Sequence, residues 1–130
     1  MAQAASEQLF RNVAKSDPLG FWSRQGLDYR GVSNFLDFNT NELSKLGGVA
    51  KSSVRLDAKI PIELKERLEQ IANIVTLVAE YFDGDAERTA LWFKTPNPML
   101  GEISPRDMIR HSRYKKLLNF VMEARAQTTR

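Results

Sequence analysis

The sequence contains no cysteine and only one histidine, His111. The absence of cysteine excludes disulfide bonds, thiolate catalysis and cysteine-based zinc sites, and a lone histidine excludes a metal site built from several histidines. A Ser-His-Asp triad would depend on this one histidine, and no nucleophile-elbow motif accompanies it. We therefore predict a protein that is not an enzyme and that has no cofactor, no catalytic residues and no metal site.

Long apolar runs are also missing. No stretch approaches the roughly 18 residues that a membrane-spanning helix needs, and the segment Met1–Glu7 lacks the basic and apolar regions of a signal peptide. We expect a soluble, cytoplasmic protein. The net charge is only +3, but its distribution is uneven: residues 1–60 hold 8 Lys/Arg against 6 Asp/Glu, residues 61–100 hold 4 against 7, and residues 101–130 hold 7 against 3. The two basic parts can therefore face different partners.

No segment alternates between apolar and polar residues for long enough to predict a strand, so we expect an all-α protein without a sheet. The expected helices cover residues 6–15, a start at Leu19–Trp22, Tyr29–Leu36, Asn41–Leu46 with Thr40 as the N-cap, Val49–Arg55, Ile62–Phe82, 86–93, a helix beginning at Ser104, and Arg113–Ala124. In the long helix, apolar residues recur at spacings of three and four, at Leu64, Leu68, Ile71, Val75, Val78 and Phe82, which indicates burial on a broad face.

The sequence predicts two functional regions, a helix-turn-helix bundle in residues 1–60 and a long helix followed by a small helical domain in residues 61–130. Residues 43–55 have helix-turn-helix spacing, with Gly48 in the turn and Val49 and Val54 facing the core. A recognition helix needs short polar or basic residues near base edges and phosphates. The predicted DNA-binding residues are Lys45, Lys51, Ser52, Ser53 and Arg55. The alternative is a plain helical hairpin with a solvated basic face.

The back of the chain carries a longer motif. Residues 90–109 contain a tryptophan at the end of a helix, a Pro-Asn-Pro loop, Leu100-Gly101 and a Ser104-Pro105 helix start, and Phe82 to Asp85 precede them. This stretch resembles the C-terminal toxin-binding domain of the Xre/MbcA/ParS antitoxins, and the resemblance extends over about residues 40–124. Members of that family commonly have a glycine in the turn before the last helix, where this chain has His111-Ser112.

The resemblance implies an antitoxin of a type II toxin-antitoxin system. Its usual partner is a RES-domain toxin that consumes NAD⁺, which the antitoxin blocks with its C-terminal domain, and it represses its own operon as a homodimer bound to operator DNA. The predicted toxin-binding residues are Trp92, Pro96, Asn97, Pro98, Arg110, Arg113 and Lys116. The alternatives are structural: Trp92 fills the core, the prolines shape a turn, and the basic residues form a solvated face. At the level of function, the alternatives are a standalone helix-turn-helix regulator without a toxin and a pure protein-interaction module.

Overall fold

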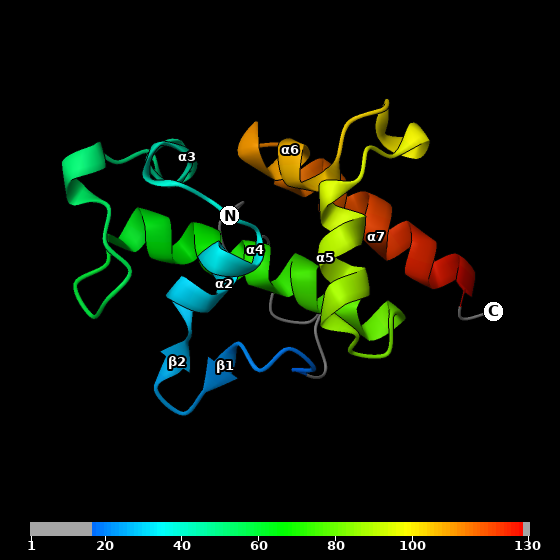
Figure 1. Ribbon diagram of the computed structural model, residues 1–130, viewed down its shortest axis with the longest axis horizontal. Helices are drawn as coiled ribbons and strands as arrows, with labels where there is room; N and C mark the ends of the chain where they lie inside the picture. The colour runs from blue at the N-terminus through cyan, green and yellow to red at the C-terminus, as the bar shows by residue number, and fades with distance from the viewer. Residues whose placement is uncertain (1–16, 129–130) are drawn as a thin grey trace, which may run out of the picture.

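The computed structural model describes residues 17–128 (Figure 1). Its elements are β1 (Trp22–Ser23), β2 (Gly26–Leu27), α2 (Tyr29–Phe35), α3 (Thr40–Gly47), the 3₁₀ helix η1 (Lys51–Ser53), α4 (Ile62–Tyr81), α5 (Ala86–Lys94), the 3₁₀ helix η2 (Pro98–Leu100), α6 (Pro105–Arg110) and α7 (Tyr114–Thr128). The predicted all-α class is confirmed, but the expectation of no sheet is wrong, because β1 and β2 form a small antiparallel hairpin. The expected helix of residues 6–15 lies outside the described residues. None of the described helices is both long enough and apolar enough to span a membrane.

Helix α4 is the centre of the fold, and α2, α3, α5 and α7 pack against it (Figure 1). Its stripe is as broad as the sequence indicates, because Leu64 and Leu68 are fully buried and every residue from Ile74 to Ala79 is buried. Within this buried stretch the Thr76 hydroxyl donates to the Ala72 carbonyl at 2.7 Å, so its polar group is satisfied inside the helix. The long helix is therefore covered by neighbours on several sides.

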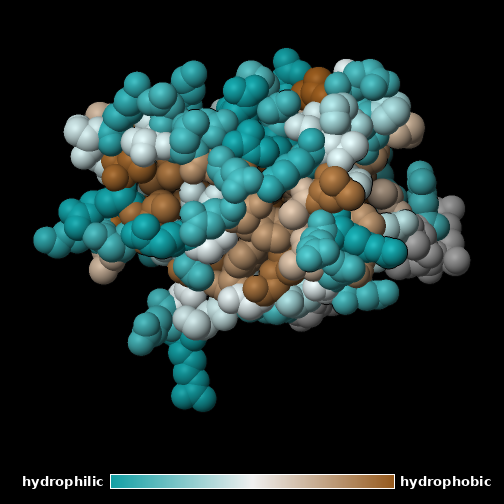
Figure 2. Space-filling view, viewed as in Figure 1, coloured by the Kyte–Doolittle hydropathy of each residue, from teal (hydrophilic) through white to brown (hydrophobic). Residues whose placement is uncertain are grey.

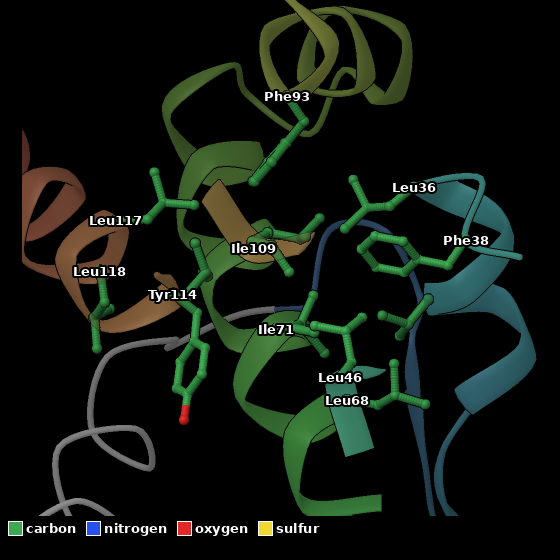
Figure 3. Packing of buried hydrophobic residues seen from close by; sticks show 14 of the residues in the cluster. Leu36, Phe38, Leu46, Leu68, Ile71, Phe93, Ile109, Tyr114, Leu117 and Leu118 are labelled. Atoms are coloured by element: carbon green, nitrogen blue, oxygen red, sulfur yellow. The ribbon is translucent and has the colours of Figure 1, made fainter. Parts of the chain in front are cut away.

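One continuous hydrophobic core joins the front of the described chain, up to residue 60, to its back, from residue 61 onward. Figure 3 shows Leu36, Phe38 and Leu46 from the front converging with Phe93 and Ile109 from the back around α4. Each fully buried side chain of this size contributes about 1.5–3 kcal/mol relative to an exposed one. The front and the back of the chain are thus stabilised by shared contacts, while the expected boundary near residue 60 stays a prediction.

The helix expected to start at Leu19–Trp22 is wrong, because these residues lead into the hairpin instead. The Asp17 carboxylate accepts hydrogen bonds from the backbone N–H groups of Phe21 (2.9 Å) and Trp22 (3.0 Å). In β1 and β2, Trp22 pairs with Leu27 and Ser23 pairs with Gly26. The register places Phe21 and Leu27 in the core, so burial and the Asp17 contacts override a helical start.

The helix expected at Val49–Arg55 is also wrong, since only Lys51–Ser53 form a single 3₁₀ turn. Helix α3 ends at Gly48 in the left-handed conformation (φ 64°), as the sequence predicts for the turn. Beyond η1, Val54 and Leu56 are half-buried against the core at a spacing of two, which suits an extended chain. Figure 2 shows hydrophobic side chains on this side of the molecule, beside η1 and the start of α4.

Candidate functional site

The segment between α5 and α6 is an ordered loop held together by hydrogen bonds of Asn97. Its side chain accepts from the Met99 N–H at 2.9 Å, its N–H donates to the Ile103 carbonyl at 3.0 Å, and its carbonyl accepts from the Glu102 N–H at 3.0 Å. Gly101 (φ 82°) and Glu102 (φ 67°) take the left-handed conformation that closes the loop. Asn97 is therefore half-buried and committed to internal bonds, whereas the flanking Pro96 and Pro98 are exposed.

Trp92 is half-buried and contacts the core, where its ring packs edge-on against Phe93 with the ring centroids 5.0 Å apart. It also lines an open groove of about 270 Å³ between α4, α5 and α7. The groove is lined by Leu77, Val78, Tyr81, Phe82, Trp92, Phe120, Val121, Ala124, Arg125 and Gln127. Trp92 thus contributes both to the core and to an accessible apolar surface, so the two interpretations of this residue are compatible.

Two exposed apolar side chains beside the loop were not among the predicted site residues. Leu91 is 67% exposed on α5 and Met99 is 77% exposed on η2. An exposed leucine alone carries little information. The sequence signal that could have identified them is their position: Leu91 is adjacent to Trp92, and Met99 lies between Pro98 and Gly101.

The start of α6 follows the sequence prediction: the Ser104 hydroxyl accepts from the Asp107 N–H at 3.1 Å, and Pro105 occupies the first turn. The turn into α7 contains Ser112 at φ 62°, the left-handed region that favours glycine. A glycine would adopt this conformation without strain. The Arg113 N–H donates to the Met108 carbonyl at 2.7 Å and fixes α7 to α6.

The three predicted basic contacts lie on α6, the turn and α7. Arg113 and Lys116 are exposed, whereas the Arg110 side chain is 40% exposed. Arg110 Nε lies 3.2 Å from Asp107 Oδ1 and 3.8 Å from Glu42 Oε2. The end of α6 and the start of α7 therefore form a basic surface, one member of which is held by acidic neighbours.

Arg106 is another basic residue of α6, close in sequence to Arg110 and Arg113, but it points into the fold. It donates from Nε to the Leu36 carbonyl, and from Nη2 to the Asp37 carbonyl at 2.8 Å and to Glu42 Oε1 at 3.0 Å. Its guanidinium carbon lies 5.2 Å from the centroid of the Phe38 ring. No sequence pattern reveals these contacts, because their partners lie more than sixty residues away in the chain.

A second ion pair supports the same turn between α2 and α3. Lys94 Nζ lies 2.6 Å from Asp37 Oδ2, and this hydrogen bond holds the pKa of the Asp37 carboxyl below its ordinary value. Asp37 itself is at φ 54°, a conformation that Asp tolerates better than most residues. The turn is thus tied to both α5 and α6.

The predicted DNA-binding residues lie on α3, η1 and the chain that follows. Lys45, Lys51, Ser52, Ser53 and Arg55 are all exposed. Arg55 is already paired: its Nε and Nη2 donate to the two Asp57 carboxylate oxygens at 2.8 and 2.6 Å. This bidentate contact lowers the pKa of Asp57 to about 2. The structure brings these residues to one end of the molecule without placing them on a recognition helix.

Within residues 17–128, no group of three or more His, Asp and Glu side chains is arranged to hold a metal ion. The site offers a stiff loop, exposed apolar side chains and a basic helix end.

In comparisons with known proteins, this part of the chain is similar to antitoxins. Residues 77–113 match the model of the antitoxin Xre/MbcA/ParS C-terminal toxin-binding domain. The chain is also 26% identical over 110 residues to the mycobacterial cidal antitoxin MbcA of Mycobacterium tuberculosis and of Mycobacterium bovis, which covers 85% of this chain and 89% of that protein. No solved structure matches the chain. The resemblance drawn from sequence is confirmed: residues 77–113 match the toxin-binding domain of the Xre/MbcA/ParS antitoxins, and most of the chain is similar to an antitoxin of that type.

Proposed function

We propose that this chain neutralises a RES-domain, NAD⁺-consuming toxin through α5, the Asn97 loop, α6 and the start of α7, and that it represses its own operon as a cytoplasmic homodimer bound to operator DNA. The observation that carries the proposal is the match of residues 77–113 to the toxin-binding domain. The relative MbcA is itself named as an antitoxin. The runner-up is a standalone regulator that binds DNA but no toxin.

The shape of the loop favours binding to a protein. Pro96 and Pro98 restrict the backbone, and Asn97 fixes the remainder by its hydrogen bonds, so the loop loses little conformational entropy on association. Leu91 and Met99 add exposed apolar area beside it. The basic residues Arg110, Arg113 and Lys116 complement an acidic surface on the toxin.

The DNA-binding part of the proposal is supported by the cluster of Lys45, Lys51, Ser52 and Ser53 at the α3 end of the molecule. Because η1 is a single turn, this region favours phosphate contacts over base readout from a helix. The affinity should therefore depend strongly on salt.

Toxin binding is tested by growth rescue when the chain is co-expressed with the toxin from the neighbouring reading frame. The variant replaces Arg110, Arg113 and Lys116 with Gln, and the control replaces Arg24, Arg30 and Lys65 with Gln, so both lose three positive charges. We expect rescue to weaken only in the first. Equal rescue by both variants contradicts the basic surface, and failure of the parent chain to bind any neighbouring toxin favours the standalone regulator.

DNA binding is tested with the duplex upstream of the gene. The double variant Lys51→Ala/Arg55→Ala should bind less tightly and with a shallower salt dependence, since each lost phosphate contact lowers the slope of log K against log salt by about one. Exposed positions of this kind contribute little to folding. Equal affinity of variant and parent at matched salt excludes this surface as the DNA contact.

A further inference from the structure

A polar cluster around Arg106 also links the front and the back of the chain. Its guanidinium joins α6, which lies inside the segment matched to the toxin-binding domain, to the turn between α2 and α3, which lies outside it. Its side chain is only 19% exposed, and that of Glu42 is 14% exposed. A charged pair shielded from water to this degree is screened much less than a surface pair.

Glu42 is the residue on which these contacts converge. Its Oε1 accepts both the Asn39 N–H, at 3.0 Å, and Arg106 Nη2, at 3.0 Å, and its Oε2 lies 3.8 Å from Arg110 Nε. The Asn39 side chain in turn accepts from the Glu42 N–H at 2.8 Å, which completes a capping box at the start of α3. A rigid helix start therefore holds the carboxylate that both arginines approach.

The consequence for the toxin-binding surface follows from the shortness of α6. This helix has six residues, and its end carries Arg110 and the bond that fixes Arg113. The orientation of α6 thus sets the direction of the basic residues at the start of α7. The Arg106 contacts, to Leu36, Asp37 and Glu42, anchor that orientation from the other side.

We propose that Arg106 and Glu42 are positioning residues for toxin binding, so that the front of the chain takes part in neutralisation by holding α6 in place. The inference rests on the proposed toxin-binding function and adds residues outside the matched domain to it. Neither residue needs to touch the toxin. Arg106→Lys should not substitute for arginine, because an ammonium lacks the planar fork that reaches three acceptors at once.

The test is the affinity for the purified toxin from the neighbouring reading frame, measured for Arg106→Gln, Glu42→Gln and the double variant. Glutamine at position 42 keeps the capping box and removes only the charge. We expect the Kd to rise about tenfold for Arg106→Gln, less for Glu42→Gln, and no further in the double variant than in Arg106→Gln alone. Amide exchange at Met108 and Ile109 should quicken in the same variants.

Val32→Ala is the matched control, because it removes buried methyl groups from α2 and the Val32 side chain makes none of the hydrogen bonds of the Arg106 cluster. It should lower the melting temperature without changing the Kd. An unchanged Kd in Arg106→Gln, an equal rise in Val32→Ala, or additive effects of Arg106→Gln and Glu42→Gln would each overturn the proposal. If the parent chain itself does not bind the toxin, the proposed function fails, and this outcome can be told apart from failure of the positioning proposal, in which the parent binds.

Discussion

Gly47 lies where α3 closely approaches α4, and Gly47→Ala tests this contact directly. A Cβ at this position would lie 2.9 Å from Leu64 Cβ and 3.1 Å from Leu64 Cα. Neither atom belongs to the flexible end of a side chain, so the change cannot be absorbed by rotating Leu64. Helix α3 would have to move away from α4.

Two opposing effects decide the size of the change. Overpacking a close contact costs about 1–3 kcal/mol, while replacing glycine by alanine in a helix returns up to about 1 kcal/mol. We therefore expect the free energy of unfolding to fall by about 1–2 kcal/mol. For a chain of this size each kcal/mol corresponds to a melting temperature lower by about 3–5 °C.

The assay is urea denaturation followed by circular dichroism, with Asn41→Ala on the exposed face of the same helix as the control. The control should be neutral or slightly stabilising, and Gly47→Val should lose more than Gly47→Ala. Leu64→Ala should not rescue Gly47→Ala, because the tightest contacts are to Cβ and Cα. A Gly47→Ala protein as stable as the parent would refute the close packing of α3 on α4.

Four further outcomes are expected. Ser104→Ala should lower the free energy of unfolding by about 1 kcal/mol in chemical denaturation, because the N-cap of α6 is lost. Burial first and the neighbouring Glu69 carboxylate second raise the pKa of Tyr29 to about 12, so an ultraviolet titration should show one tyrosine ionising near pH 12, and this step should be missing in Tyr29→Phe. The stability that the protonated Tyr29 contributes is complete below about pH 10 and disappears as the pH rises toward 12. Asp57→Asn should release Arg55 and steepen the salt dependence of binding to a DNA duplex; an unchanged slope would mean that Arg55 does not contact phosphate. A chain of residues 62–130 should aggregate in a sedimentation assay, because α4 loses the cover of α2 and α3.

The elements that sequence analysis predicted well are those in which local chemistry and burial agree. The broad apolar stripe predicted α4 to within one residue at its C-terminal end, and Asp85 and Ser104 cap α5 and α6 as their positions indicate. Each of these signals is local, since a cap acts within three residues and a helical stripe repeats every turn.

The misses have both local and non-local causes. Asn39, rather than Thr40, is the N-cap of α3, because its side chain and that of Glu42 form a reciprocal pair that a single-residue preference does not capture. At Val49–Arg55 the helix gives way to core contacts of Val54 and to the pairing of Arg55 with Asp57. Whether such contacts prevail over local helix preference depends on the tertiary structure around the segment.

The residues that form the candidate site could be predicted from the sequence, but the contacts that hold them in place could not. Sequence places Trp92 and the proline loop together, and the structure adds that Asn97 is internal. The role of Arg106 could not be derived, because an arginine in a basic row has the same local pattern whether it faces solvent or a carbonyl seventy residues away.

The burial of α4 among its neighbouring helices affects how the protein is degraded by proteases in a cell. Proteases cleave backbone that has opened, and here opening either end removes contacts from the same helix, so both ends should become cleavable in one cooperative event. A destabilising change anywhere along α4 would then shorten the lifetime of every surface at once. We therefore expect substitutions in the packing of α4 to change the steady-state abundance of the chain more than substitutions in the loop or the basic helix end.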